Sequence, residues 1–472
     1  MSVGKRLMIR RLGLAIFGAV APIAATVLAP AATAQQTPQS RAPSTHDLAI
    51  AAGYKAGITC SATFIGGRTE AQIAADELSG IYADYNAIVP RLAAKIDRAQ
   101  GIVSVAYGDA LPPRLAIWSP ATGCTTMPIG TQPERRSASF LPVPAVSGGS
   151  AAPWPMGDAL PRISRPALPP VAAAFDGTTY GRSKTTGVVV LKAGQLVAER
   201  YADGFGPFTA QRTWSVAKSI TGTLVGMAVK RGVLNLNAPA PIGAWQIKGD
   251  PRRAITLDNL MRMASGLHSD TAGNRTDAVY FGGTTVPEGT LHWPLEARPG
   301  TRFRYANNDI LLAMLSVRTA LGDKLYATFP RDALFSKIGM AHTIGETDWQ
   351  GNYIGSSQVW TTARDLARFG LLYANDGLWN GERLLPQGWR SYVSTPSGPQ
   401  PGTGEFGYGA TFWLMNKSAG VPADTFSADG NRGQYVVIIP SRNIVIVRRG
   451  EDAGGGGFDI AKFTADIVAA LH

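Results

Sequence analysis

Apolar residues recur at helical spacing after Trp214 and predict one long, buried helix. The recurring positions are Val216, Ile220, Leu224, Met227 and Ala228. They share one helix face, and Gly232 follows them as a typical helix stop. We therefore expect a helix from about Trp214 to Arg231.

Two apolar runs, each interrupted by a turn, predict β-hairpins. The first spans residues 187–198 and turns at Ala193-Gly194, and the second spans residues 435–447 and turns at residues 440–443. The chain between the hairpins is mostly helical in pattern. Residues 460–471 have an apolar face at helical spacing, so we expect a C-terminal helix that packs on a sheet.

The region before residue 138 has a different pattern. An alanine-rich stretch from Thr69 to Ala99 predicts helix, and short apolar runs flank it at residues 58–65 and 102–107. We expect residues 35–137 to form an N-terminal accessory region, to which the pattern assigns no role.

Proline dominates the next segment, residues 138–175. Eight prolines lie between Phe140 and Phe175, and proline lacks the N–H that a regular helix or a central strand needs. This segment is predicted to be an extended linker or an arm that wraps over the following domain, residues 176–472.

The first 34 residues are typical of an export signal. Four basic residues precede an apolar run from Leu12 to Leu28, and Ala32-Thr33-Ala34 has the small residues of a cleavage site. We expect a signal peptide over residues 1–34 and a periplasmic or secreted mature protein. Sec export fits better than the twin-arginine route, to which Arg10-Arg11 has only a loose likeness. The alternative is an uncleaved anchor, although Pro22 interrupts the apolar run.

The overall composition suits one large or two medium globular domains. Of the 472 residues, 45% are hydrophobic. The formal charge of +12 falls to +8 when the four basic residues of the signal peptide are removed. The arginines are scattered without a nucleic-acid-binding motif, so we expect a solvated basic surface and no nucleic-acid partner. No segment after the signal predicts stable membrane insertion, and the oligomeric state does not follow from the sequence.

Cys60 and Cys124 are the two cysteines of the chain. An exported protein meets an oxidising compartment, so a Cys60–Cys124 disulfide is our hypothesis. Two buried free thiols are the alternative.

Ser215-Val216-Ala217-Lys218 carries the main chemical signal. The serine lies in the first turn of the predicted helix, and the i, i+3 spacing directs the Lys218 amine to the same face. Burial lowers the pKa of a lysine, and a neutral amine can take the proton of the Ser215 hydroxyl as that oxygen attacks a carbonyl carbon. By itself the pattern is weak, since Ser2-Val3-Gly4-Lys5 also matches it.

Tyr305-Ala306-Asn307 lies where an extended segment leads into a helix, so the tyrosine can face a cleft. A second Tyr-x-Asn, at Tyr373, ends an amphipathic run that starts at Thr362 and precedes Gly377. We assign this second copy a structural role at a helix end.

The chain resembles the serine β-lactamase and penicillin-recognising superfamily in four motifs. They are the Ser-x-x-Lys at Ser215, the Tyr-x-Asn at Tyr305, residues 260–267 and Gly430-Asn431-Arg432-Gly433-Gln434. The likeness is to the branch that contains class C β-lactamases, family VIII carboxylesterases and 6-aminohexanoate-dimer hydrolases, and it covers about residues 176–472. It implies an α/β (α+β) fold in which an antiparallel sheet flanked by helices meets an α-helical subdomain, with the active site between them.

The resemblance also implies roles for single residues. Ser215 would be the acylated nucleophile, Lys218 its base and Tyr305 the proton shuttle to the leaving group. Asn307 would orient Lys218 or a substrate amide, or it could simply cap a helix. The oxyanion hole would come from the N–H groups of Ser215 and of Asn431, the residue after Gly430 on the edge strand.

One departure from the family pattern concerns the substrate. Penicillin-binding members have Lys-Thr-Gly where this chain has Ala428-Asp429-Gly430, so the cation that would hold a β-lactam carboxylate is absent and Asp429 would repel an anionic group. Arg432 could restore positive charge, but we expect a solvated side chain there.

The sequence therefore predicts a serine hydrolase that acts on small esters or linear amides through an acyl-enzyme. The alternatives are a penicillin-recognising binding or sensing module, a β-lactamase or a D-alanyl peptidase. The five histidines lie in no Ser-His-Asp context and lack zinc-ligand spacing, so we expect neither metal nor cofactor.

Overall fold

The computed structural model of this chain describes residues 42–132, 151–160, 168–268, 276–402, 404, 406–454 and 456–471. The described residues from Ser44 onward form one unit. The predicted signal peptide and much of the predicted linker lie outside the described residues. In the described part, no helix is both long and apolar enough to cross a membrane.

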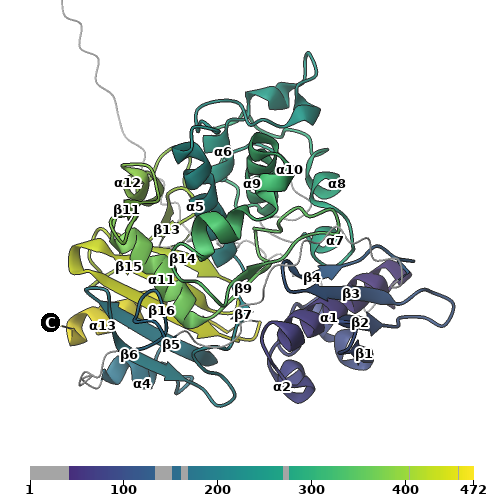
Figure 1. Ribbon diagram of the computed structural model, residues 1–472, viewed down its shortest axis with the longest axis horizontal. Coiled ribbons are helices and arrows are strands. Elements are labelled where there is room, and N and C mark those ends of the chain that lie inside the picture. Colours follow the sequence, from purple (N-terminus) through teal and green to yellow (C-terminus); the bar gives the residue numbers. More distant parts are fainter. Residues whose placement is uncertain are drawn as a thin grey trace, which may run out of the picture. The chain divides into compact units, whose positions relative to one another are not determined.

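The largest sheet among the described residues is antiparallel and seven-stranded (Figure 1, lower left), with the strand order β12-β13-β14-β15-β16-β5-β6. The strands are β5 (Thr185–Lys192), β6 (Gln195–Tyr201), β12 (Gly407–Tyr408), β13 (Trp413–Leu414), β14 (Phe426–Gly430), β15 (Gln434–Ile439) and β16 (Ile444–Gly450). The two predicted hairpins are confirmed as β5–β6 and β15–β16. Because β16 also pairs with β5, the two hairpins lie side by side.

Neighbouring residues of the central strands face two different cores, because side chains alternate along a strand. Val189 belongs to one hydrophobic cluster and Val188 to another. Helix α11 (Ala363–Ala374) covers the first face, and α4 (Pro169–Ala173) and α13 (Ile460–Ala470) cover the second. The predicted C-terminal helix and its packing on the sheet are confirmed.

The helical part of the fold carries the helix predicted after Trp214. Its helices are α5 (Val216–Lys230), α6 (Leu257–Met261), α7 (Asp277–Tyr280), α8 (Val286–Thr290), α9 (Asn307–Leu321), α10 (Asp323–Tyr326) and α12 (Trp389–Ser394). Helix α5 contacts both α9 and strand β14, and its bounds agree with the prediction within the usual uncertainty of helix ends. The mixed α/β architecture, with an antiparallel sheet flanked by helices, is as predicted.

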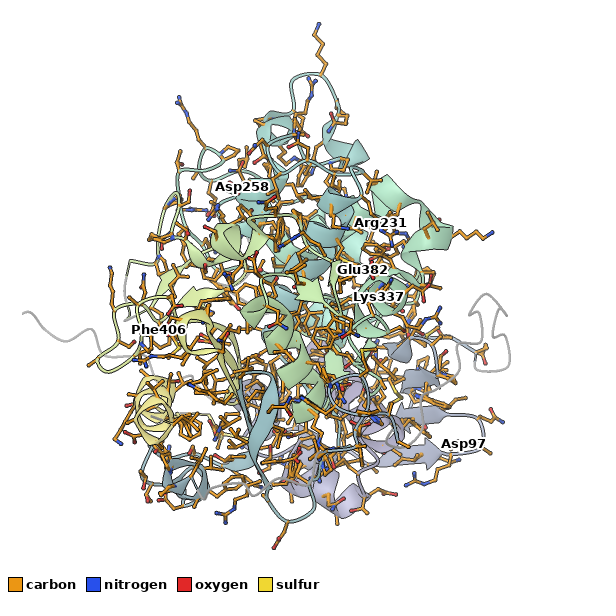
Figure 2. The ribbon with its side chains drawn as sticks, turned by 60° about the vertical axis from the view of Figure 1, so that its left-hand side comes forward. Asp97, Arg231, Asp258, Lys337, Glu382 and Phe406 are labelled. Carbon is orange, nitrogen blue, oxygen red and sulfur yellow. A yellow bond between two sulfur atoms is a disulfide. The ribbon has the colours of Figure 1, made fainter. Side chains whose placement is uncertain are left out.

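Two small sheets of short strands lie in the same part of the chain. The three-stranded sheet consists of β7 (Gln211–Arg212), β9 (Val359–Thr361) and β8 (Ile344–Gly345), and β10 (Leu378–Trp379) pairs with β11 (Glu382–Arg383). On the surface, Lys337 Nζ lies 3.0 Å from a carboxylate oxygen of Glu382 (Figure 2). Such an exposed pair contributes little to stability.

The accessory region corrects the predicted helix over residues 69–99. That stretch holds only the short helices α2 (Glu70–Ala75) and α3 (Ala83–Asn86), and its end is strand β1 (Ala94–Asp97). Gly80, at φ +62°, and Pro90 interrupt a continuous helix.

The long helix of the accessory region lies earlier, at α1 (Thr45–Phe64). It begins at a capping box in which the Ser44 and Asp47 side chains each accept from the other residue's backbone N–H. It therefore includes most of the apolar run predicted at residues 58–65. Helix α1 packs on a four-stranded sheet made of β1, β2 (Ile102–Val105), β3 (Arg114–Ser119) and β4 (Gly123–Thr126).

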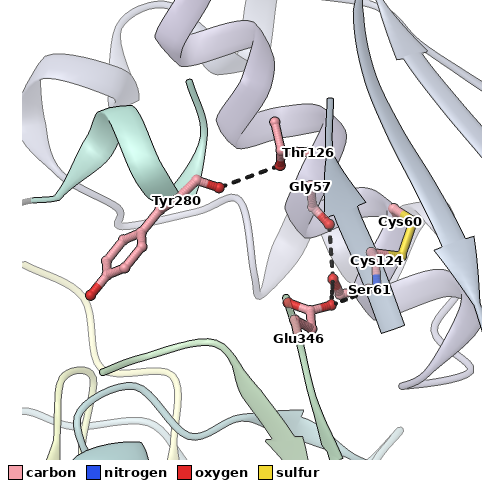
Figure 3. The surroundings of a disulfide bond; sticks show 7 residues. All are labelled: Gly57, Cys60, Ser61, Cys124, Thr126, Tyr280 and Glu346. Atoms are coloured by element: carbon pink, nitrogen blue, oxygen red, sulfur yellow. Dashed lines mark hydrogen bonds between the residues drawn. A yellow bond between two sulfur atoms is a disulfide. The ribbon is translucent and has the colours of Figure 1, made fainter. Parts of the chain in front are cut away.

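A disulfide joins helix α1 to strand β4 (Figure 3). It links Cys60 to Cys124, whose Cα atoms are 6.0 Å apart. Beside it, Glu346 accepts hydrogen bonds from Ser61 Oγ at 2.5 Å and from the Cys124 N–H at 3.0 Å. Burial raises the pKa of Glu346 to about 7. These bonds attach the accessory region to the chain that follows strand β8.

Candidate active site

Ser215 lies at a sharp turn between strand β7 and helix α5. Trp214 has a left-handed φ of +51°, and the Arg212 guanidinium stacks 3.8 Å from the centre of its ring. The Thr213 N–H donates to the Val359 carbonyl at 2.8 Å, which fixes the chain just before the turn. Ser215 is the N-cap residue of α5, and its side chain makes no capping bond. Its hydroxyl is therefore available for chemistry.

Lys218 contacts Ser215 as the spacing predicts. Lys218 Nζ lies 2.9 Å from Ser215 Oγ and 2.9 Å from the Ser356 carbonyl oxygen, and the residue is 1% exposed. Burial, assisted by the nearby charge of Arg212, lowers the pKa of Lys218 to about 7. A substantial fraction of this amine is therefore neutral at physiological pH and able to accept the Ser215 proton.

Tyr305 completes the group at the entry to helix α9. Its ring centre lies 4.9 Å from Lys218 Nζ, and its ring packs against Trp413 and Tyr408. Burial raises the pKa of the Tyr305 phenol, and a hydrogen bond with Ser215 opposes that rise. The phenol is protonated at neutral pH, as a proton donor to a leaving group must be.

Asn307 lies at the same site but does not orient the lysine. Its Nδ2 donates to Thr276 Oγ1 at 2.8 Å, whereas Lys218 bonds to Ser215 and Ser356. Asn307 lines the cavity in front of Ser215. The lysine-orienting role is therefore corrected, and contact with a substrate amide stays a prediction.

Gly430 lies against the backbone of the nucleophile, and Asn431 lines the cavity in front of it. A Cβ on Gly430 would lie 2.4 Å from the Thr213 carbonyl oxygen and 3.2 Å from the Ser215 nitrogen, so only glycine fits without a shift of the backbone. Strand β14 is third in the order of the sheet, so the prediction of an edge strand holds only for its last residues. Its neighbour β13 pairs only with residues 426–427, so β13 ends before the site.

Arg432 is buried, which corrects its predicted solvation. It is 8% exposed and has a left-handed φ of +58°. Its Nε lies 2.8 Å from a Glu451 carboxylate oxygen, and its terminal nitrogens donate to the Ser79 carbonyl at 2.8 Å and the Asp76 carbonyl at 3.0 Å. Arg432 thus anchors the Asn431 loop to the accessory region.

A cavity of about 760 Å³ opens in front of Ser215. Eight of its lining residues are aromatic: Tyr82, Trp214, Tyr280, Tyr305, Phe406 (labelled in Figure 2), Trp413, Tyr435 and Phe458. The sequence does not predict most of these residues as part of the site, because they come from distant segments with no shared motif. Tyr82 comes from the accessory region, so that region forms part of the cavity wall.

The second Tyr-x-Asn copy has the structural place assigned to it. Tyr373 is buried near the end of α11, and its hydroxyl lies 2.7 Å from Thr223 Oγ1 in the core.

The comparisons with known proteins agree with this geometry. A family model described as Beta-lactamase matches residues 172–469, which is more than half of the chain. The chain therefore belongs to the β-lactamase family, within the penicillin-recognising serine hydrolases, and is an enzyme of the hydrolase class. The match begins after the accessory region.

Several relatives refine this likeness. The 6-aminohexanoate-dimer hydrolase of Paenarthrobacter ureafaciens is 27% identical over 291 residues, which are 56% of this chain and 72% of that protein. A Bacillus anthracis structure, provisionally assigned as a 6-aminohexanoate-dimer hydrolase, is 25% identical with a TM-score of 0.53, over 61% of this chain and 79% of that one. A family VIII carboxylesterase structure shares the fold at 16% identity and a TM-score of 0.53, over 66% of this chain and 99% of that one.

Proposed function

We propose that this protein is an exported serine hydrolase that cleaves small esters or linear amides through an acyl-enzyme on Ser215. The observation that carries the proposal is the 2.9 Å contact between Lys218 Nζ and Ser215 Oγ at the wall of an open cavity. A buried lysine with a pKa of about 7 is the base that such a serine needs.

In the proposed reaction, neutral Lys218 takes the Ser215 proton as Oγ bonds to the substrate carbonyl carbon. The carbonyl oxygen gains the negative charge and lies between the N–H groups of Ser215 and Asn431. Donors fixed in this way stabilise the transition state by about 3 kcal/mol. When the tetrahedral intermediate collapses, the bond to the leaving group breaks, and Tyr305 donates the proton that the leaving group needs.

Hydrolysis of the acyl-enzyme uses the same residues, with water as the attacking nucleophile and Ser215 Oγ as the leaving group. Lys218 first passes the proton it took from Ser215 to Tyr305, which restores the neutral amine and the phenol. A water molecule then attacks the acyl carbon and gives its proton to Lys218. The ester bond to Ser215 Oγ breaks, and Lys218 returns the proton to Oγ. No other protein nucleophile is required.

One relative and the residues at positions 428–429 support linear amides or esters as the substrate class. The protein from Paenarthrobacter ureafaciens is named for a linear aminohexanoate dimer. Ala428-Asp429 supplies no cation for a β-lactam carboxylate. These observations support the amide or ester substrate class without selecting one compound.

Export is proposed from the first 34 residues together with the Cys60–Cys124 bond. A disulfide is typical of proteins in oxidising compartments.

Turnover of a three-member panel tests the proposed function. The panel contains a short-chain nitrophenyl ester, a chromogenic cephalosporin and a linear aminohexanoate dimer, and mature protein is compared with Ser215→Ala. We expect the ester or the dimer to be hydrolysed by the wild type and not by the variant. Stoichiometric acylation without turnover would instead favour the sensing alternative, and equal activity of both proteins would exclude Ser215 as nucleophile.

A further inference from the structure

Asp429 brings a carboxyl group to the catalytic cavity; burial raises its pKa to about 7, and a hydrogen bond with Ser427 opposes that rise. It precedes Gly430 at the end of strand β14 and pairs with Tyr435 across the sheet. It lines the same cavity as Ser215. Among the described residues, its buried Oδ1 has no hydrogen-bond partner. A buried carboxylate oxygen without a partner is costly, and a ligand that donates to it or carries positive charge removes that cost.

The rest of the cavity wall suits a cation. Eight of the described lining residues are aromatic, and none is lysine or arginine. Aromatic faces attract ammonium groups, most strongly where water is excluded. Trp214, Tyr280, Tyr305 and Phe458 already have a protein cation over the ring, so the rings that suit a ligand cation are those of Tyr82, Phe406, Trp413 and Tyr435. The other lining carboxylate, Asp459, is already engaged, because its Oδ1 accepts from the Lys462 N–H at 2.9 Å as the cap of α13. Asp459 is also exposed to solvent, whereas Asp429 has a buried oxygen without a partner among the described residues, so Asp429 gains more from a bound cation.

Asp429 also lies near the bond that is cleaved. It is adjacent to Gly430, whose added Cβ would lie 3.2 Å from the Ser215 nitrogen, and consecutive Cα atoms are about 3.8 Å apart. A cation held by Asp429 would consequently lie in the same cavity as the carbonyl that Ser215 attacks.

We propose that Asp429 and the aromatic wall select substrates that carry an ammonium group close to the scissile ester or amide bond. This inference rests on the proposed hydrolase function and adds the charge of the substrate to it. Asp429 acts here as a specificity-determining residue and takes no part in the bond-breaking step.

A pair of nitrophenyl esters of matched shape tests the selection. The cationic probe is the nitrophenyl ester of 4-(trimethylammonio)butanoate, and its uncharged carbon isostere is the ester of 5,5-dimethylhexanoate. We expect the wild type to favour the cationic ester in kcat/KM by roughly tenfold or more. In Asp429→Asn, the ratio of the two kcat/KM values should approach the ratio of the esters' uncatalysed hydrolysis rates. Asp459→Asn is the matched change in the same cavity and should keep the wild-type preference for the cationic ester.

A binding measurement separates this inference from the proposed function. Choline and its uncharged isostere 3,3-dimethylbutanol are titrated into Ser215→Ala. The readout is the change in tryptophan fluorescence, to which Trp214 and Trp413 on the cavity wall contribute. Choline should bind more tightly than the isostere, and the difference should disappear in Ser215→Ala with Asp429→Asn. Hydrolysis of both esters without charge preference, or a preference that survives Asp429→Asn, would overturn the inference alone. Absence of hydrolysis with choline selectivity intact would instead contradict the proposed function.

Discussion

Arg432 donates to the Ser79 carbonyl across 2.8 Å and thereby joins the loop of the predicted oxyanion hole to the accessory region. The family match begins at residue 172, so Ser79 lies outside the matched segment. The same stretch supplies Tyr82 to the cavity wall. The accessory region is thus part of the site, although its sequence carries no catalytic motif.

Arg432→Lys should lower kcat by about tenfold while changing KM less. Lysine keeps the charge beside Glu451 but loses the planar fork that reaches two carbonyls, so the Asn431 N–H is less well fixed. Steady-state kinetics with the preferred ester checks this, with exposed Arg442→Lys as the control. A kcat equal to that of the wild type would show that the anchor does not serve the oxyanion hole.

The hairpins and α5 could be predicted because their signals are local: apolar periodicity, a turn and a glycine stop. Helix α1 was missed although its capping pair, Ser44 and Asp47, is visible in the sequence. Its alanine- and glycine-rich surface is buried on several sides, which weakens the contrast between polar and apolar faces.

The candidate site also contains residues that local sequence patterns predict and residues that they do not. Ser215 and Lys218 are one helical turn apart and follow from spacing alone. The Ser356 carbonyl, Tyr82 and Trp413 reach the site from distant segments by tertiary packing. No pattern within any one segment predicts that convergence. The burial of Arg432 also depends on contacts with a distant segment and was not predicted from the sequence.

The pH dependence of activity should follow Lys218. The amine must be neutral to accept the Ser215 proton, so kcat/KM should fall below a pH of about 7, by up to about tenfold per pH unit, and level off above it. A pH profile with a substrate that does not titrate measures this. A plateau extending well below pH 6 would argue against lysine as the base.

The lowered pKa of Lys218 should also make the unfolding free energy depend on pH. The pKa of Lys218 is about 7 in the folded protein against an ordinary value of 10.5, so the unfolded chain binds more protons between these values. Unfolding free energy should therefore rise with pH across this window. Urea unfolding at pH 7 and pH 9 should show a smaller rise for Lys218→Met than for the wild type, and an identical rise in both would refute the shifted pKa.

Tyr305→Phe should reduce kcat by about 10²-fold or more with little change in stability. The ring contacts with Trp413 and Tyr408 remain, and only the proton-donating hydroxyl is lost. Tyr373→Phe is the matched control at the other Tyr-x-Asn. It should retain activity and lose about 1 kcal/mol of stability, because Thr223 loses a buried partner. The reverse pattern would mean that the two tyrosines have been assigned the wrong roles.

Removing the disulfide should destabilise the accessory region. Replacing both Cys60 and Cys124 by alanine is expected to cost about 2–4 kcal/mol of unfolding free energy. Urea denaturation measures the loss, and thiol counting under denaturing, non-reducing conditions checks the bond itself. Two free thiols in the exported protein would show that the bond does not form there.

Locating the acyl group on the protein tests the proposed mechanism most directly. Mature protein is mixed with a nitrophenyl ester, quenched in acid during turnover and analysed by intact mass and peptide mapping. We expect one acyl group per chain, located on Ser215, and none in Ser215→Ala. An acyl group on another residue, or undiminished turnover by Ser215→Ala, would contradict the proposed mechanism.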